Sequence, residues 1–295
     1  MNFDRSLDAS PGVEVRLSPL VSRLLAPNPG PFTFKGTGVY IVGAGARVAV
    51  IDPGPALPEH IAALQHALAP RQVSHILVTH THRDHSPAAA ALKAWGGART
   101  YGLALGTANA PAIAQQDMVD EAHDHDFVPD IVVQDGMRIS GEGFELECVA
   151  TPGHTANHIC YALAQEGALF SGDHVMGWST SVIAPPDGDM GDYLASLEKL
   201  KARQDRIFYP THGSPVAAPG DWLDRLIAHR HMREEQILAA LTARSRAVSE
   251  LAKQLYPLLE PALRPAAAQQ IGAHLAHLQS RGLVAAESGR WRLKS

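Results

Sequence analysis

The sequence predicts an α/β fold in which two β-sheets lie between outer helices, followed by a helical C-terminal part. Short apolar runs alternate with amphipathic helical segments up to about residue 215, and they do so in two similar halves. Strand signals then nearly vanish after about residue 221. We therefore expect a four-layer αββα sandwich over residues 1–220 and a second domain over residues 221–295.

The first half of the sandwich begins with strands and a hairpin and continues with strand–helix–strand units. Its expected segments are, in order, strands within 13–26 and 33–54, a helix at 58–69, a strand at 73–79, a helix from Ser86 to Gly96, and a strand at 98–102. Ser86 is the expected N-cap of its helix, with Pro87 at the first helical position. The Gly-rich stretch 38–46 joins two strands and opens no helix, so a dinucleotide site is disfavoured there.

The second half has shorter strands, and the C-terminal part is mostly helical. Strands are expected at 144–153, 158–164, 168–173 and 206–213, with a helix at 192–203 before the last of them. Beyond them we expect helices at 226–242, 248–257 and 265–283 and a hairpin at 283–294 that turns at Ser288 and Gly289. Three helices and a β-wing describe a winged-helix unit, which reads nucleic acid in some proteins and makes protein contacts in others.

The composition is that of an ordinary globular chain, with 45% hydrophobic residues, 19% charged residues and a formal net charge of −5. The N-terminus lacks a basic start before an apolar run, and no later stretch offers about 18 apolar residues, so we expect neither a signal peptide nor a membrane span. Cys148 and Cys160 are expected to be free, buried thiols, which fits a cytoplasmic protein. Residues 221–295 hold 11 basic and 7 acidic residues, against 14 and 23 in residues 1–220, which favours two units with different surfaces.

The densest cluster of potential metal ligands follows the expected strand 73–79. His80, His82, Asp84 and His85 lie within six positions of one another. Side chains alternate along a strand, so His80 and His82 can project together, while the turn before the next helix can direct Asp84 and His85 the other way. Imidazole and carboxylate are good ligands for Zn²⁺, and a second pair so close indicates two metal ions.

One such cluster would leave two ions short of ligands, so further ligands should lie at comparable strand ends. His154, Asp173 and His212 each follow an apolar strand-like run. Seven potential ligands at strand ends exceed what a chance placement of 16 histidines would give. Other histidines are expected to be surface or hydrogen-bonded structural residues: His60, His66, His75, His123, His125, His229, His231, His274 and His277. The acidic run 120–127 is interpreted as a solvated loop.

Four motifs carry a resemblance to a known family. THTHRDH (79–85), GHT (153–155), FSGD (170–173) and PTHG (210–213), in this order, resemble the signature of the metallo-β-lactamase fold superfamily of metal hydrolases. The resemblance implies a first metal ion on His80, His82 and His154, a second on Asp84, His85 and His212, and Asp173 bridging both. IDPG (51–54) resembles an early strand end of the family, where Asp52 would be hydrogen-bonded to the ligand loop.

The C-terminal part narrows the resemblance. HRHMREEQIL (229–238), with the helices and wing that follow, is similar to a subgroup with an appended winged-helix domain, which includes an animal mitochondrial endoribonuclease. The resemblance then reaches nearly the whole chain. The expected recognition helix offers only Arg281 as a basic residue in 266–281, so we interpret this domain as a lid or dimer element before a DNA reader.

The expected activity is hydrolysis by two Zn²⁺ ions, with Fe or Mn as alternatives. Two ions about 3.5–4 Å apart can share a bridging water and lower its pKa from about 15.7 to about 7, so that hydroxide attacks the substrate. Asp84 would also orient this nucleophile. True β-lactamases of this fold lack a bridging aspartate, so Asp173 favours thioesterases, lactonases and nucleases.

A small acyl compound, namely a thioester, ester or lactone, is the expected substrate. The main alternative is a single-strand endoribonuclease, with RNA as partner, although the acidic residues 1–220 disfavour phosphate-backbone binding. A β-lactamase, a mono-iron sulfur dioxygenase and a non-enzymatic regulator are further alternatives. The sequence leaves the substrate, the native metal and a homodimer open.

Overall fold

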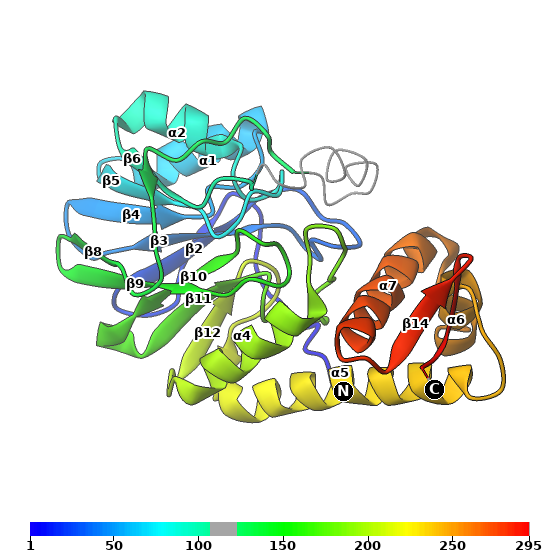
Figure 1. The fold of residues 1–295 in the computed structure, drawn as a ribbon. Helices are drawn as coiled ribbons and strands as arrows, with labels where there is room; N and C mark the ends of the chain where they lie inside the picture. The colour runs from blue at the N-terminus through cyan, green and yellow to red at the C-terminus, as the bar shows by residue number, and fades with distance from the viewer. Residues whose placement is uncertain (107–122, 295) are drawn as a thin grey trace. The chain divides into compact units, whose positions relative to one another are not determined.

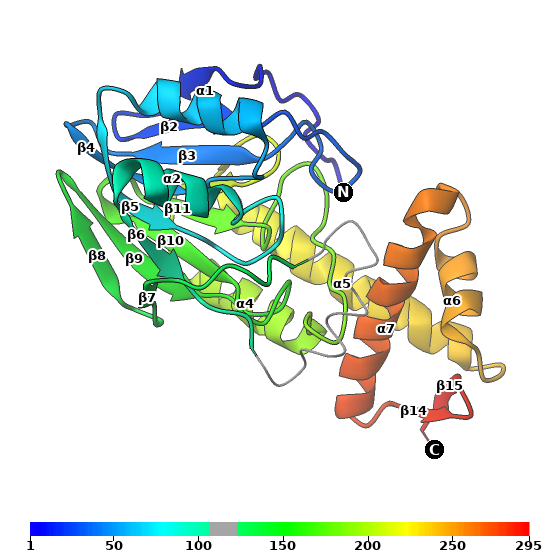
Figure 2. The ribbon, with the colours of Figure 1, turned by 90° about the horizontal axis from the view of Figure 1, so that it is seen from above.

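The computed structural model describes residues 1–106 and 123–294, which form two compact units. The first unit comprises residues 1–151, 157–181 and 204–219, and the second comprises residues 152–156, 182–203 and 220–295. Figures 1 and 2 show the elements of each unit. None of the helices within residues 1–106 and 123–294 combines the length and the hydropathy that a membrane span requires.

The first unit contains a seven-stranded and a six-stranded sheet. The first sheet follows chain order: β1 (Glu14–Arg16), β2 (Val21–Leu25), β3 (Gly38–Val42), β4 (Arg47–Ile51), β5 (Gln72–Leu77), β6 (Arg99–Gly102) and β7 (Ile131–Val132). Its pairs are antiparallel as far as β4 and parallel from β4 to β7. The second sheet has the order β13 (Val216–Ala217), β12 (Ile207–Pro210), β11 (Ala168–Gly172), β10 (Ile159–Leu163), β9 (Phe144–Ala150) and β8 (Arg138–Gly141). In that sheet β11 and β12 pair in parallel.

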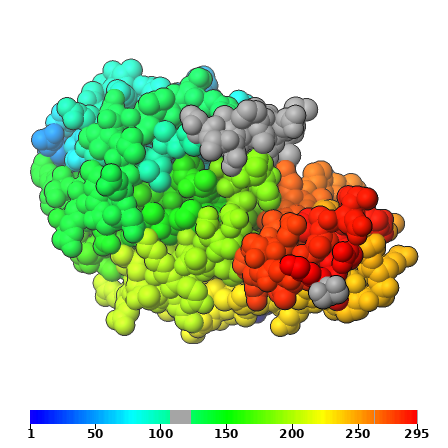
Figure 3. Space-filling view, viewed as in Figure 1, coloured from blue at the N-terminus to red at the C-terminus, as the bar shows by residue number. Residues whose placement is uncertain are grey.

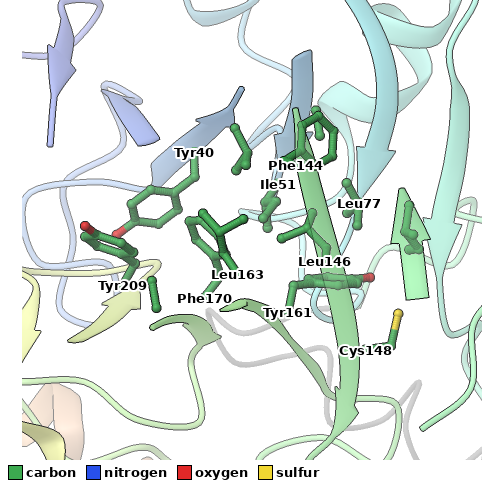
Figure 4. Close-up of a cluster of buried hydrophobic side chains, with 14 of the residues drawn as sticks. Tyr40, Ile51, Leu77, Phe144, Leu146, Cys148, Tyr161, Leu163, Phe170 and Tyr209 are labelled. Atoms are coloured by element: carbon green, nitrogen blue, oxygen red, sulfur yellow. The ribbon is translucent and has the colours of Figure 1, made fainter. Parts of the chain in front are cut away.

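Two apolar layers hold this unit together. Tyr40 and Ile51 of the first sheet meet Tyr161 and Phe170 of the second in one buried cluster (Figure 4). Ile41, next to Tyr40, points to the opposite face and packs with the helices α1 (Pro58–Leu68) and α2 (Ala88–Gly96). The alternation of apolar residues on both faces of β3 explains why all five of its residues are buried.

The second unit contains the helices and hairpin of the C-terminal part. Its elements are α4 (Met190–Ala202), α5 (Pro219–Leu241), α6 (Val248–Leu255), the 3₁₀ turn η2 (Pro261–Leu263), α7 (Arg264–Ser280), β14 (Val284–Glu287) and β15 (Arg290–Leu293). Ile237 of α5, Leu251 of α6, Leu275 of α7 and Val284 of β14 share one buried cluster. Figure 3 shows the outer surface of α7 and the hairpin in orange and red. Three helices and a wing are present, as predicted.

Two expectations for local structure are confirmed. The hairpin turns at Ser288 and Gly289, whose φ angles are +49° and +74°, values that the turn requires and glycine adopts readily. Cys148 and Cys160 are free and buried. Burial raises the pKa of Cys148 to about 12, so this thiol is not a nucleophile at neutral pH.

The expected cap at the start of α2 is wrong. The helix begins at Ala88, and its N-cap is Pro87 without a side-chain cap. The Ser86 hydroxyl instead donates to Asp124 Oδ2 at 2.7 Å. A carboxylate far along the chain thus outcompetes the helix for this hydroxyl. The helix ends at Gly96, as expected, and Gly97 takes the left-handed conformation at its C-cap, with φ +70°.

Candidate metal centre

Strand ends of the first unit carry most of the predicted ligands. Asp52 follows β4, the cluster 80–85 follows β5, Asp173 follows β11 and His212 lies two residues after β12. β4 and β5 are parallel, as are β11 and β12, so the carboxyl ends of each pair meet at one edge of its sheet. Motifs that lie far apart in the sequence are therefore close together in the structure.

Two imidazoles and two carboxylates converge at this edge. His212 Nε2 lies 3.0 Å from Asp84 Oδ2 and 3.4 Å from Asp173 Oδ2. His85 Nε2 lies 3.3 Å from Asp84 Oδ2 and 3.5 Å from Asp173 Oδ2. Both rings are buried, and the Asp84 side chain is 22% exposed. The carboxylate of Asp84 is therefore the more open of the two to solvent, since that of Asp173 is 11% exposed.

The second nitrogen of each ring fixes its direction. His85 Nδ1 donates to Asp52 Oδ2 at 2.9 Å, and His212 Nδ1 donates to the carbonyl of Gly36 at 3.1 Å. Because Nδ1 keeps its proton, Nε2 is the nitrogen of each ring that can bind a metal ion. This is the arrangement in which outer hydrogen bonds hold imidazole ligands for a metal ion. The donor set therefore fits a divalent cation bound by nitrogen and oxygen.

Asp52 accepts four hydrogen bonds at this edge, from three residues. Its Oδ1 accepts from the Thr79 amide at 2.7 Å, and its Oδ2 accepts from the hydroxyls of Thr79 and Thr211, each at 2.8 Å. Together with the bond from His85, these contacts account for a carboxylate that is 1% exposed. Asp52 itself has φ +49°, which turns the chain out of β4. The hydrogen bond to the ligand loop that the resemblance implies is thus present.

Charge is strongly coupled among these side chains. Burial alone would raise the pKa of Asp84, but the neighbouring His85 and His212 hold it well below its usual value. Burial alone would lower the pKa of His212, but Asp173 and Asp84 raise it to about 10. The charged carboxylates of Asp84 and Asp173 therefore need positive charge near them. Either a metal ion or protonated imidazoles can supply it.

His80 and His82 form the other part of the cluster. His80 Nε2 and His82 Nδ1 lie 2.8 Å apart, and His80 Nδ1 lies 3.1 Å from the Thr79 hydroxyl. Ligand atoms of His80, His85 and Asp173 lie within 4.8 Å of one another, as do those of Asp84, His85 and His212. Asp173 therefore lies near His80 as well as near His212.

His154 belongs to the second unit. It lies in the short segment 152–156, which the chain enters after Thr151 and leaves at Asn157, both of which belong to the first unit. Its Nδ1 donates to the carbonyl of Val182 at 2.6 Å, and the residue is 4% exposed. Its assignment to a metal ion stays a prediction.

The interpretation of 120–127 as a solvated loop is wrong for its middle. Residues 120–122 lie outside the described residues, but His123 is 2% exposed and its ring centre lies 4.8 Å from that of His82. The Asp124 amide donates to the carbonyl of Thr81 at 2.6 Å. Backbone pairing with the ligand loop buries this segment, and composition alone does not reveal such pairing. His125 and Asp126 are exposed, as expected.

His158 was not singled out by the sequence reasoning. It is fully buried, its Nδ1 lies 2.8 Å from the Thr151 hydroxyl, and its ring centre lies 5.1 Å from that of His80. A Cβ atom at Gly172 would lie 2.5 Å from its Nε2, so only glycine fits immediately before Asp173. The sequence feature that could have indicated a buried His158 is its position directly before the apolar run of β10.

Comparison with known proteins identifies the family. The model of the metallo-β-lactamase superfamily matches residues 33–212, and that of the β-lactamase-associated winged helix domain matches residues 247–291. A β-lactamase-like protein 2 homolog of Caenorhabditis elegans is 33% identical over 91% of this chain and 87% of its own length. An atrochrysone carboxyl ACP thioesterase of Paecilomyces divaricatus is 34% identical over 78% of this chain and 67% of its own.

Solved structures agree on the fold. A metallo-β-lactamase family protein of Thermus thermophilus has a TM-score of 0.79 at 25% identity and covers 95% of this chain and all of its own. A β-lactamase domain protein of Burkholderia ambifaria has a TM-score of 0.82 at 19% identity, over 98% of this chain and 95% of its own. The chain belongs to the metallo-β-lactamase superfamily and is a metal-dependent hydrolase with a C-terminal winged helix domain. The predicted α/β sandwich fold is confirmed.

Proposed function

We propose that this protein is a dinuclear metal-dependent hydrolase of a small acyl substrate: a thioester, ester or lactone. The observation that carries the proposal is the place of Asp173. Its Oδ2 lies 3.4 Å from His212 Nε2 and 3.5 Å from His85 Nε2, and it also groups with His80. A carboxylate shared by two sets of imidazoles is suited to bridge two ions.

The proposed ligand sets follow the motifs. His80, His82 and His154 would hold the first ion, Asp84, His85 and His212 the second, and Asp173 would join them. The segment that carries His154 follows Thr151 and precedes Asn157, both of which belong to the first unit. The nitrogen and oxygen donors suit zinc, and they also suit iron or manganese.

The chain's own residues fit such chemistry. Bound metal ions would supply Lewis acidity, which lowers the pKa of water and polarises a carbonyl group. The partly exposed Asp84 would orient a water molecule and hold its proton. Asp52 and the carbonyl of Gly36 keep the rings of His85 and His212 from turning away. A cysteine nucleophile is not needed, and both cysteines are buried.

The acyl substrate class is supported by a relative's name. The Paecilomyces relative is named as a thioesterase that acts on an acyl carrier protein. Its likeness over 78% of this chain favours hydrolysis of an acyl bond over that of a phosphodiester. The arginines at α7 are Arg264, its first residue, and Arg281, its C-cap, and this placement at the two ends does not favour RNA. We further propose a cytoplasmic protein, since both thiols are free.

Parallel hydrolysis assays test the substrate class. The metal-loaded protein is given S-lactoylglutathione, an acyl-pantetheine thioester, an acyl-homoserine lactone and a single-stranded RNA. We expect turnover of an acyl substrate that falls at least 100-fold in Asp173→Ala, beyond the roughly 10–100-fold typical of outer hydrogen-bond partners. Asp8→Ala, at an exposed aspartate, is the matched control. Cleavage of RNA alone would contradict the acyl proposal and favour the endoribonuclease.

A further inference from the structure

The segment that carries His154 is held by residues 182–203 of the same unit. The amide of Asp189 donates to the carbonyl of Gly153 at 2.9 Å, and the Ser196 hydroxyl donates to that of Pro152 at 2.8 Å. Asp189 is also the N-cap of α4. The start of α4 and the segment 152–156 are therefore fixed to each other close to His154.

The packing at Gly153 is close enough to exclude a side chain. Gly153 has φ +137°, and a Cβ atom there would lie 2.3 Å from the Cα atom of Tyr193. Tyr193 is fully buried, and the guanidinium of Arg230 on α5 lies 4.9 Å from its ring centre. Backbone thus packs on backbone, so a shift of α4 must move His154 as well.

The imidazole of His154 takes its direction from the same segment. Its Nδ1 donates to the carbonyl of Val182 at 2.6 Å, which leaves Nε2 as the acceptor nitrogen. The next residue, Ile183, is fully buried and donates its amide to Gln270 Oε1 on α7 at 3.1 Å. One peptide unit thus receives the His154 ring through its carbonyl and contacts α7 through its amide.

A second contact of α7 lies further along the same helix. His277 Cδ2 would lie 3.1 Å from a Cβ atom at Gly191, in the first turn of α4. Glu234 of α5 holds His277 in turn, because His277 Nδ1 lies 2.6 Å from its Oε1. Gln270 and His277 are two turns apart on one face of α7, so this helix supports both ends of the segment 183–191.

We propose that Gln270 is a positioning residue for His154: through the 182–183 peptide, α7 of the winged helix domain sets the direction of a metal-ligating imidazole. The inference rests on the proposed function, because it takes His154 to be a ligand of the first ion. In this proposal the winged helix domain supports metal binding by orienting His154, and this role requires neither nucleic acid nor a second subunit. Gln270 touches neither metal nor substrate and acts only through the Val182–Ile183 peptide.

Metal affinity of matched variants tests the inference. Gln270→Met removes the acceptor at nearly constant volume, Gln270→Glu keeps an acceptor oxygen, and Gln269→Met makes the same change one position earlier on α7. Zinc dissociation constants are measured by chelator competition on the full chain, and thermal unfolding is measured without metal. His154→Ala serves as the reference for loss of the first ion.

We expect Gln270→Met to weaken one of two zinc ions by about 10–100-fold and to leave the other unchanged. Gln270→Glu should restore most of this affinity, and Gln269→Met should match the wild type. If His154→Ala loses one ion while Gln270→Met binds both normally, the inference is overturned and the proposed function stands. Equal weakening of both ions with lower metal-free stability would also overturn it. A wild type that never holds two ions would contradict the proposed function itself.

Discussion

Among single residues, Asp52 joins the ligand His85 to the ends of two strands. It accepts from Thr79, Thr211 and His85 while 1% exposed. Asp52→Asn places an amide among these donors, so one of its contacts turns from attractive to repulsive. We expect zinc affinity to fall by about 10–100-fold and the metal-free chain to lose about 1–3 kcal/mol of unfolding free energy. Chelator competition and urea unfolding measure both.

Asp8→Asn, at an exposed aspartate, is the control for this change. Unchanged zinc affinity in Asp52→Asn would show that the His85 ring keeps its direction without the carboxylate.

The hydrogen bonds around the proposed ligands differ in whether the sequence can predict them. Asp52 follows a recognisable strand end, so its bond to the ligand loop could be predicted. The carbonyl of Gly36, which holds His212, could not, because every residue has a carbonyl group.

At the scale of elements, Glu234 joins α5 to α7. Its carboxylate is 4% exposed and lies 2.6 Å from His277 Nδ1 and 3.3 Å from the Arg281 guanidinium. Burial alone would raise the pKa of Glu234, but the neighbouring His274 and His277, the second of which is hydrogen-bonded to it, lower the pKa from 4.5 to about 2. A lowered pKa means that the stabilisation is present above about pH 4.5 and is lost as the pH falls toward 2.

Glu234→Gln removes this dependence. We expect the variant to be less stable than the wild type at pH 6, and the difference to shrink between pH 5 and pH 2 as the wild-type carboxylate takes up its proton. Thermal unfolding followed by circular dichroism, on metal-free protein, measures the difference at each pH. Glu235→Gln, at an exposed neighbour, should follow the wild type throughout. A gap that stays constant with pH would contradict the role of the charge.

Element type was more predictable than element ends. The helix expected at 192–203 is present, but it begins at Met190, because Asp189 accepts from the Asp192 amide at 2.9 Å and caps it. The helix expected at 226–242 begins at Pro219. Apolar periodicity is a local signal and identifies a helix, whereas the first turn depends on caps that the periodicity does not contain.

For the whole molecule, truncation of the chain can test the predicted domain boundary at residue 220. Contacts place residues 152–156 and 182–203 with residues 220–295, although the motifs suggest one catalytic stretch. Sequence patterns predict both sheets and the winged helix because their signals are local. Sequence patterns do not show that residues 152–156 and 182–203 group with residues 220–295. This grouping depends on hydrogen bonds such as that between Ile183 and Gln270, which are 87 positions apart.

A chain cut after residue 220 therefore lacks the contacts that support His154. We expect such a fragment to bind zinc through Asp84, His85 and His212 while it loses affinity for the other ion by about tenfold or more. Elemental analysis after dialysis against a weak chelator compares it with the full chain. If the fragment holds two ions as tightly as the full chain, residues 1–220 are an independent metal-binding domain, as the boundary predicts.

We propose that this edge of the two sheets holds two metal ions bridged by Asp173. The most direct test is the number and identity of metal ions per chain in the native full-length protein, measured by elemental analysis beside Asp173→Ala. We expect about two zinc ions per chain in the wild type and one or fewer in the variant. One iron ion per chain, or two ions retained in Asp173→Ala, would contradict the bridged dinuclear centre.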